Sequence, residues 1–393
     1  MEDLKRAAVE AVEPLAPYWF ELSDRIHANP EFNFNEYKAS KWLCEAFEKL
    51  GFTAELGAGG IDTAFTAVLD SKKPGPSVGI IIEYDAIEGL GHACAHNTKG
   101  PAVLCGIEAF LKTCPDFRGK IIAFGCPAEE GGGGKIIMTE AGVFKAADVC
   151  LELGVGPDFG TGSKVLARQG LTLTSIGKSA HAGLRHLPSI NALDSLLFVL
   201  GSLDYLRKHL GTQGIINAII EDGGKNPAVI PGRAVVQMEV RATKKALLEK
   251  YVDAIEKLVH ISQSVSGARI DVKKSLTYLD YVKCPSLATM VMNNFRELGI
   301  EAEWLLDMEP RGSSDVGNVS HTVPTETIYI GLQHGLVPHT PEYREAAGGE
   351  PGHRAIVNGG KMLAMCLIDL LVHDSDELLQ RARHEFESAR IEE

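Results

Sequence analysis

The segment VGIIIE at residues 78–83, followed by GHACAHN at residues 91–97, contains the pattern from which fold and chemistry can be inferred. The apolar run at 78–82 is typical of a buried strand. The second segment places one thiol and two imidazoles, those of Cys94, His92 and His96, within five residues. Thiolate and imidazole are ligands that a borderline-soft divalent metal such as Zn²⁺ prefers. Open α/β sheets bind their ligands at strand ends, so this loop is a candidate site.

Strand and helix patterns alternate on both sides of this segment. The sequence predicts two helices between residues 3 and 50 and an α/β sandwich whose sheet is mostly parallel. This arrangement resumes after residue 280, and a solvated helix is expected over the charged residues 374–393. The predicted strands are 63–69, 78–83, 120–125, 148–155 and 324–330, and the predicted helices are 100–112, 134–141 and 355–371.

A different pattern occupies the middle of the chain. Strand-like segments and two long helical segments follow one another in the order β-α-β-β-α-β, which is that of a ferredoxin-like split unit inserted as a lid. The strands are expected at 171–176, 215–221, 234–241 and 268–276, and the helices at 189–209 and 244–265. We therefore expect a catalytic domain over 1–167 and 280–393 and a lid domain over 168–279.

Composition excludes several classes of partner. A formal net charge of −13 over 393 residues disfavours nucleic acid and anionic membranes. No apolar run approaches the roughly 20 residues that span a bilayer. The N-terminus lacks a signal-peptide core, and the eight cysteines form no CxxC pair. These features predict a cytoplasmic protein.

Carboxylates and a further histidine could complete the site. Glu129 and Glu130 follow the strand predicted at 120–125, and adjacent residues on a loop point in different directions. One carboxylate can then ligate a metal while the other accepts a proton from a metal-activated water. His339 lies between two prolines, which restrict its loop. The alternatives are a core thiol, a loop histidine, a surface turn of solvated glutamates and a surface histidine.

With these residues, the chain resembles a family of metallopeptidases and amidohydrolases that includes aminoacylase, carboxypeptidase G and the auxin-conjugate hydrolases. It is most similar to the branch of p-aminobenzoyl-glutamate hydrolase and related dipeptidases. The resemblance implies a zinc-exopeptidase-like α/β/α catalytic domain, a lid that dimerises, and two divalent metals that hydrolyse an amide bond. The matching segments run in family order: 83–86 with the GHACAHN loop, PAEEGGGGK at 127–135, 177–182, 190–193, SSDVGNVS at 313–320 and 339–342.

The resemblance also assigns roles by position. It implies the general base Glu129 and the metal ligands Cys94, His96, Glu130 and His339, with Zn²⁺ or Mn²⁺, or else Co²⁺, as the metal.

In the lid, His181 resembles a histidine that reaches the active site of the partner subunit and stabilises an oxyanion. Arg241 resembles an arginine that pairs with a substrate carboxylate. The implied substrate is a small N-acyl amino acid or dipeptide.

The chain departs from the family pattern at three positions. Ala95 stands where the branch usually has glycine, and Ala228 replaces a lid asparagine, although Asn226 lies close by. Gly154 falls where the remaining metal ligand is expected. Glu152 shares a strand face with Gly154 but lies about 6.6 Å back, so it could reach a metal only if the strand shifts or bulges.

These departures leave alternatives open. A mononuclear or altered metal site could perform other C–N chemistry such as deamination. A non-catalytic homologue that binds small molecules is the third reading.

Overall fold

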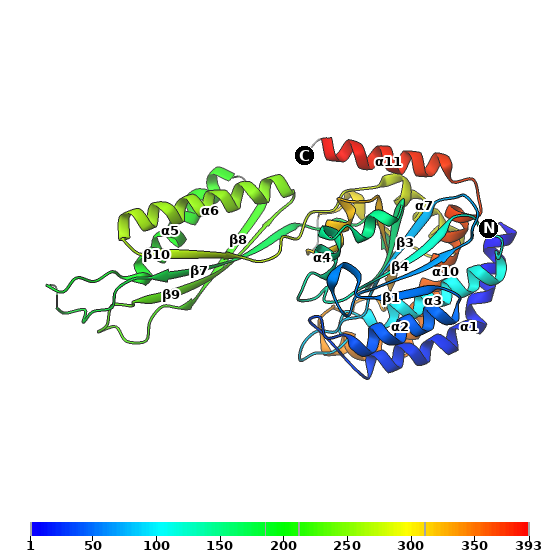
Figure 1. Cartoon of the computed structure of the whole chain (residues 1–393), viewed down its shortest axis with the longest axis horizontal. Helices are drawn as coiled ribbons and strands as arrows, with labels where there is room; N and C mark the ends of the chain where they lie inside the picture. The colour runs from blue at the N-terminus through cyan, green and yellow to red at the C-terminus, as the bar shows by residue number, and fades with distance from the viewer. Residues whose placement is uncertain (1, 185, 211–212, 310–311, 392–393) are drawn as a thin grey trace. The chain divides into compact units, whose positions relative to one another are not determined.

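Four parallel strands form the centre of an eight-stranded mixed sheet in the computed structural model, which describes residues 2–184, 186–210, 213–309 and 312–391 (Figure 1). The parallel strands lie in the order β4-β3-β5-β12. Their bounds are Ser77–Glu83 for β3, Lys120–Cys126 for β4, Val149–Gly156 for β5 and Thr325–Gly331 for β12. The prediction of a mostly parallel sheet is confirmed at this centre.

Shorter strands extend the sheet on both sides. β2 pairs with β4, and β1 pairs with β2, both in antiparallel fashion. On the other side β6 pairs with β12 and β11 with β6. These strands are β1 (Thr53–Leu56), β2 (Phe65–Asp70), β6 (Gly160–Thr161) and β11 (Glu303–Trp304).

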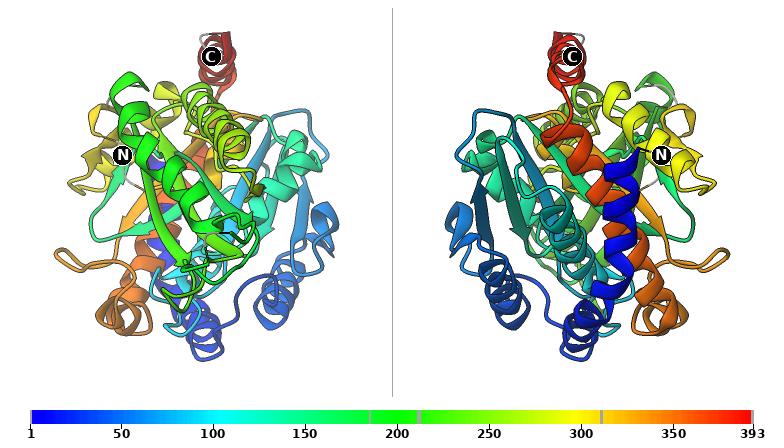
Figure 2. Two further views of the ribbon diagram at one scale, coloured as in Figure 1. Left: turned by 90° about the vertical axis from the view of Figure 1, so that its left-hand side faces the viewer. Right: turned by 90° about the vertical axis from the view of Figure 1, so that its right-hand side faces the viewer.

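Alternate residues of the central strands face two different layers, as the period of two in a β-strand requires. In β5, Val149, Leu151 and Leu153 belong to the main apolar core, which several long helices share. Glu152 and Gly154 therefore lie on the opposite face. Figure 2 shows α1 and α10 side by side on the core face. The helices that contribute to this core include α1 (Asp3–His27), α2 (Tyr37–Lys49), α3 (His96–Thr113), α7 (Pro285–Glu297) and α10 (Glu350–Leu371).

Two predicted helices differ from those observed. Helix α3 begins at His96 instead of residue 100, because the Thr98 hydroxyl and amide both bond to the carbonyl of Ala95 and close one turn before Pro101. Helix α11 (Asp376–Ile391) is exposed over only part of its surface, so the prediction of a solvated helix is confirmed in part. It buries Ala382 and bonds to α7 through Glu385, which accepts hydrogen bonds from Ser286 at 2.8 and 3.0 Å.

The remaining helical segments of the chain are short. They are α4 (Gly134–Glu140), α8 (Val316–Ser320), α9 (Pro341–Ala347) and the 3₁₀ turns η1 (Ala58–Gly60), η2 (Val143–Ala146) and η3 (Leu305–Asp307).

A second compact unit comprises Val165–Asp280 together with residues 312–317. Its four strands form an antiparallel sheet in the order β10-β7-β9-β8, and Figure 1 shows α5 and α6 on the same side of that sheet. The ferredoxin-like chain order β-α-β-β-α-β is confirmed. The elements are β7 (Ala167–Ile176), α5 (Ala192–Leu210), β8 (Gly214–Asp222), β9 (Arg233–Ala242), α6 (Lys245–Ser266) and β10 (Arg269–Lys274).

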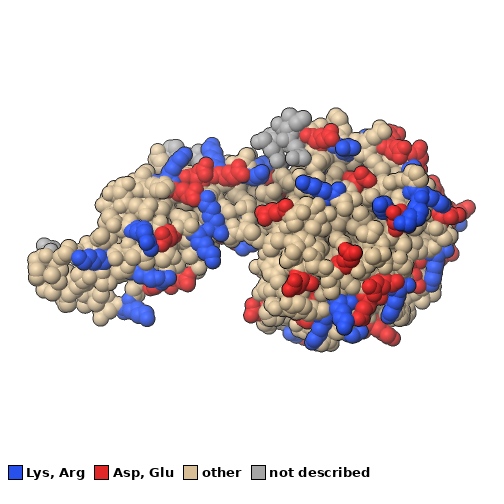
Figure 3. All heavy atoms as spheres, in the orientation of Figure 1, with Lys and Arg blue, Asp and Glu red and all other residues tan. Residues whose placement is uncertain are grey.

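Two further observations concern the surface. Within the described ranges, no single helix is long and apolar enough to cross a membrane. Helices α10 and α11, taken together across the sharp bend between them, have the length and composition of a membrane-spanning segment, and nothing beyond length and composition suggests one. Figure 3 shows lysine and arginine interspersed with acidic residues on the displayed face, without one large basic patch.

Candidate metal centre

The candidate site lies where the central strands end. Glu83 is the last residue of β3, and Glu129 and Glu130 follow β4. Cys94 precedes α3, and His339 precedes α9. Backbone contacts tie these loops together, because the amide of His339 donates to the carbonyl of Ala93 at 2.9 Å. The parallel arrangement thus gathers segments that are far apart in the sequence.

Three of these loops contain a non-glycine residue in the left-handed region. Ala95 has a φ of 58°, Ala128 of 57° and His339 of 64°. Such backbone conformations cost free energy and concentrate at functional sites. Two residues that are two positions apart on an extended loop would be expected to point to the same side, but the turn at Ala95 prevents this for Cys94 and His96, since His96 already begins α3.

Cys94 and His96 consequently join different neighbours. The ligand atoms of Cys94, Glu130 and His339 lie within 4.8 Å of one another, and we call these three residues the thiolate cluster. His96 lies instead in a group with Glu129 and Glu130 at the same separation. Glu130 is common to both groups.

The thiolate cluster fits a divalent cation. Sulfur, nitrogen and oxygen ligands in one group are the set that Zn²⁺ takes in catalytic sites, where three protein ligands leave one position open. Oε1 of Glu130 is buried and accepts no hydrogen bond from any described residue. A cation would satisfy this atom.

The electrostatics of the cluster agree with this fit. Contacts with Cys94 and Glu130 raise the pKa of His339 to about 10. Burial opposes ionisation of Glu130, yet the neighbouring His339 and His96 lower its pKa to about 2. The pKa of Cys94 is also lowered, because the charge of His96 and the hydrogen bonds with His339 and His96 together outweigh the opposing effect of burial. Cys94 and Glu130 therefore favour their negatively charged forms when a positive charge lies beside them.

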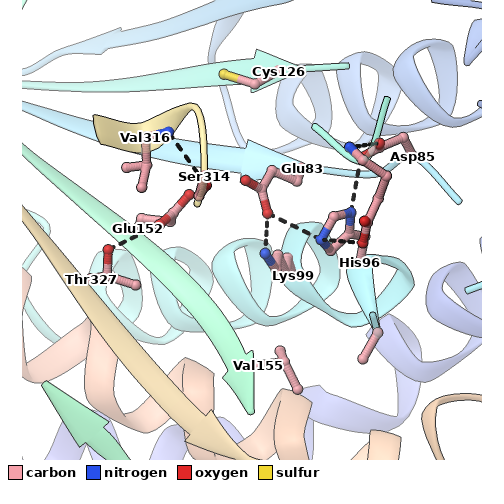
Figure 4. A network of polar contacts seen from close by, with 12 residues as sticks. Glu83, Asp85, His96, Lys99, Cys126, Glu152, Val155, Ser314, Val316 and Thr327 are labelled. Atoms are coloured by element: carbon pink, nitrogen blue, oxygen red, sulfur yellow. Dashed lines mark hydrogen bonds and ion pairs between the residues drawn. The ribbon is translucent and has the colours of Figure 1, made fainter. Parts of the chain in front are cut away.

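Asp85 braces two of these groups (Figure 4). Its Oδ1 lies 2.8 Å from Nδ1 of His96, and its Oδ2 accepts a hydrogen bond of 2.9 Å from the amide of Glu130. The other nitrogen of His96, Nε2, lies 3.3 Å from Oε2 of Glu83 and 4.0 Å from Oε1 of Glu130. Asp85 thus orients both the imidazole of His96 and the loop that carries Glu130.

His92 and Asn97 have structural surroundings. Asn97 donates to Ser23 at 2.9 Å and to the carbonyl of Ala347 at 3.0 Å. His92 packs near His27, with ring centroids 6.0 Å apart, and burial lowers its pKa to about 3. Asn97 therefore secures the loop, whereas both ring nitrogens of His92 are buried without a hydrogen-bond partner among the described residues.

Two lysines beside the site were not anticipated from the sequence. Lys99 donates to Oε2 of Glu83, and Lys135 donates to Oε1 of the same carboxylate (Figure 4 shows the first of these contacts). Burial opposes ionisation of Glu83, but the two ammonium groups hold its pKa well below the usual range. The available signal was the position of each lysine within an otherwise small or apolar stretch, because lysine is almost never buried unless it is paired.

Glu152 lies in this polar network and outside the candidate metal groups of the described residues. Its Oε2 accepts a 2.9 Å hydrogen bond from Thr327, and burial raises its pKa to about 7. Strands β5 and β12 pair in unbroken register, with Glu152 opposite Thr327 and Gly154 opposite Tyr329. The shift or bulge that Glu152 would need is not present in β5.

Gly154 faces an aromatic ring. A Cβ atom at this position would lie 2.8 Å from the ring of Tyr329, so the ring fills the space that a side chain would need. The Tyr329 hydroxyl lies 3.0 Å from that of Ser163.

The three residues predicted in the lid belong to the second unit. His181 is exposed, and its Nδ1 accepts a 3.0 Å hydrogen bond from the amide of Gly183. The side chain of Asn226 accepts one of 2.9 Å from the amide of Ala228. Arg241 donates through Nε to Oε1 of Glu239 at 2.7 Å.

Comparisons with known proteins identify relatives of both units. A family model described as a peptidase dimerisation domain, M20_dimer, matches residues 168–262. The chain is 30% identical over 412 residues to a human protein named Xaa-Arg dipeptidase, with 100% of this chain and 94% of the relative covered. It is 28% identical to a p-aminobenzoyl-glutamate hydrolase polypeptide from Escherichia coli, over 66% of this chain and 58% of that protein.

A solved structure supports the fold. The crystal structure of a Bacillus subtilis protein, described as a dinuclear metal-binding peptidase from the M20 family, superimposes with a TM-score of 0.69. The identity is 16%, and the alignment covers 91% of this chain and 99% of the other. Together with the full-length similarity to the dipeptidase, this places the chain in a family: it belongs to the M20 family of metal-dependent peptidases and amidohydrolases.

Proposed function

We propose that this protein is a metal-dependent amidohydrolase that cleaves the amide bond of a small N-acyl amino acid or dipeptide. The observation that carries the proposal is the thiolate cluster, in which Cys94, Glu130 and His339 bring their ligand atoms within 4.8 Å of one another. Glu129 stands next to this cluster in the group with His96 and Glu130. The site thus offers a metal position and a neighbouring carboxylate for proton transfer.

The metal ligands would be Cys94, His96, Glu130 and His339, and the cation Zn²⁺, Mn²⁺ or Co²⁺. When bound, such a cation lowers the pKa of a water molecule and polarises a carbonyl group. Glu129 would take the proton from the water and deliver it to the leaving amine, as a general base and then a general acid.

Residues of the second unit would recognise the substrate. Arg241 carries a planar guanidinium suited to a carboxylate, and its Nε donates to Glu239. We assign His181 to stabilisation of the oxyanion and Asn226 to substrate contact. Two relatives are named for their substrates, an Xaa-Arg dipeptide and p-aminobenzoyl-glutamate. Both substrates are amides that bear a carboxylate.

We further propose that the protein acts as a homodimer in the cytoplasm. The match of residues 168–262 to a dimerisation domain supports self-association. All eight cysteines are free thiols, which suits a reducing compartment.

The test is a hydrolysis screen with the purified protein. Dipeptides with basic or apolar C-terminal residues, N-acyl amino acids and p-aminobenzoyl-glutamate would be supplied with Zn²⁺, Mn²⁺ or Co²⁺. On the best substrate, Glu129→Gln should lower kcat by roughly 10²–10⁴-fold because the proton acceptor is lost, while the metal content is retained.

The exposed Glu140, on the neighbouring helix α4, supplies the control. Glu140→Gln should hydrolyse the substrate as fast as the unaltered protein. Absence of hydrolysis with every metal, or an unchanged rate for Glu129→Gln, would refute the proposal.

A further inference from the structure

Two lysines and two glutamates form a buried ionic network beside the thiolate cluster. Lys135 is 0% exposed, Lys99 6%, Glu83 2% and Glu152 4%. Lysine side chains are buried this deeply only when their charge is neutralised by a partner. Both ammonium groups are bound to the same carboxylate, that of Glu83, so a further cation placed there would meet positive charge.

Glu83 has both carboxylate oxygens engaged by lysine. Oε1 accepts from Lys135 and Oε2 accepts from Lys99. His96 approaches the same Oε2, with its Nε2 at 3.3 Å (Figure 4). The oxygen that could share a cation with His96 therefore already binds an ammonium group.

The neighbouring strand supplies no ligand at this position. Gly154 has no side chain, and the Tyr329 ring occupies the space beside it. Glu152 bonds to Thr327 and lies within the ionic network. On this side of His96, both oxygens of Glu83 are bound to ammonium groups, and an aromatic ring takes the space beside Gly154, so neither residue is available to bind a second metal.

We propose that this centre binds one divalent cation, in the thiolate cluster. On the other side of His96, the ammonium group of Lys99, bound by Glu83, supplies the positive charge that a second metal ion would otherwise bring. The contacts form a continuous path, from Oε1 of Glu130 to Nε2 of His96, then to Oε2 of Glu83 and Lys99. The chain would thus differ from its relative described as dinuclear. The inference rests on the proposed function for the existence of the first cation.

The test counts metal ions in the whole protein. Apoprotein would be loaded with excess Co²⁺, freed of unbound metal and analysed by elemental mass spectrometry and absorption spectroscopy. We expect one Co²⁺ per chain and a thiolate-to-cobalt charge-transfer band, both of which Cys94→Ser should abolish.

Variants of the ionic network separate the two roles of Glu83. If Glu83 serves the lysines, Glu83→Gln should still bind one Co²⁺ with the same band but unfold at a lower temperature. Lys99→Met should behave likewise, because it leaves Glu83 with one partner fewer. Lys112→Met, on the exposed face of the same helix, should change neither property.

The outcomes distinguish the two proposals. Two Co²⁺ ions per chain in an active enzyme would overturn the single-cation centre and leave the hydrolase standing. Loss of the cobalt band in a folded Glu83→Gln protein would also overturn it. A protein that binds no metal and hydrolyses nothing would remove both proposals. Should the Glu83 and Lys99 variants not fold, the count for the unaltered protein decides.

Discussion

At the scale of single residues, the surroundings give identical side chains different properties. Glu83 and Glu152 both point into the same buried network, yet paired ammonium groups lower the pKa of the first, whereas burial raises that of the second to about 7. Glu130, beside His339, has a pKa lowered to about 2. The chemistry of each glutamate therefore depends on the charge that the fold places next to it.

Ala95 provides a prediction at this scale. It is fully buried and has a φ of 58°. Valine there should lower the free energy of unfolding by about 1–3 kcal/mol, because a branched side chain fits neither the backbone nor the packed surroundings. Glycine would relieve strain of about 1–2 kcal/mol. It would lose a methyl worth about 0.8 kcal/mol and about 0.5–1 kcal/mol of backbone entropy.

The Ala95→Gly change should therefore alter stability by less than about 1 kcal/mol on these figures. Urea unfolding of the two variants beside the parent protein would check both values. An Ala95→Val protein as stable as the parent would show that the left-handed conformation is not required.

At the scale of elements, strand β12 contains a buried acid that should make stability depend on pH. Glu326 accepts hydrogen bonds from the Thr161 hydroxyl at 2.9 Å and the Gly162 amide at 2.7 Å, which join β12 to β6. Burial raises its pKa to about 7 from the ordinary value of 4.5. The folded state therefore retains this proton over a pH range in which the unfolded chain has released it.

The direction of this pH dependence follows from the number of protons that the folded and unfolded states bind. Between pH 4.5 and 7 the folded state binds more protons at Glu326 than the unfolded state, so the free energy of unfolding falls as the pH rises. The loss is at most about 3 kcal/mol. Glu326→Gln keeps an acceptor for both donors and should make this dependence less steep, leaving the variant more stable than the parent above pH 7. The slope that remains would come from groups such as Glu152, whose pKa is also raised to about 7.

Thermal unfolding across this pH range would measure the effect, with Glu140→Gln as an exposed control. The same slope in the Glu326→Gln protein would assign the pH dependence to another group.

Strand β9 places Glu239 between two arginines. Its carboxylate accepts from Arg241 and from Arg168, each at 2.7 Å, and all three side chains are only partly buried. We predict that Glu239→Gln raises KM for carboxylate-bearing substrates several-fold with little change in kcat, because Arg241 loses its anchor. Glu256→Gln, which removes the lid contact with Lys274, is the matched control.

Steady-state kinetics would show the difference. A fall in kcat without a change in KM would indicate that Glu239 acts on the reaction and not on substrate positioning.

At the scale of the whole molecule, self-association should depend on the second unit. Strand β8 is at the edge of its sheet and exposes Ile215 and Ile219, and the adjacent helix α5 exposes Phe198 and Tyr205. Exposed apolar side chains along an edge strand are typical of an interaction surface.

We predict that Ile219→Lys converts a dimer to a monomer without unfolding the protein, since the change would bury a charge in an apolar contact. Size-exclusion chromatography with light scattering would measure the mass. Val265→Lys, at a highly exposed position on α6, should remain dimeric. A dimeric Ile219→Lys protein would place the contact elsewhere.

Much of this molecule could be predicted from local sequence. The alternation of strand and helix patterns correctly gave the parallel strands β3, β4, β5 and β12, because buried strands carry a strong apolar signal. The order of elements in the second unit followed in the same way. The motif residues Cys94, Glu129 and His339 also stood out, since their side-chain chemistry is unusual for a loop.

The sequence by itself therefore determined the element types, the two-part organisation and several of the groups that could bind a metal. Only the tertiary structure decided how those groups are shared. It placed Cys94 with His339, and it turned His96 toward Glu83 because Ala95 adopts a left-handed turn. It also brought Lys99 and Lys135 onto the carboxylate of Glu83. These lysines are separated from Glu83 by 16 and 52 positions along the chain, respectively. Long-range electrostatics of this kind leave no periodic pattern in the sequence, so they become visible only in the folded chain.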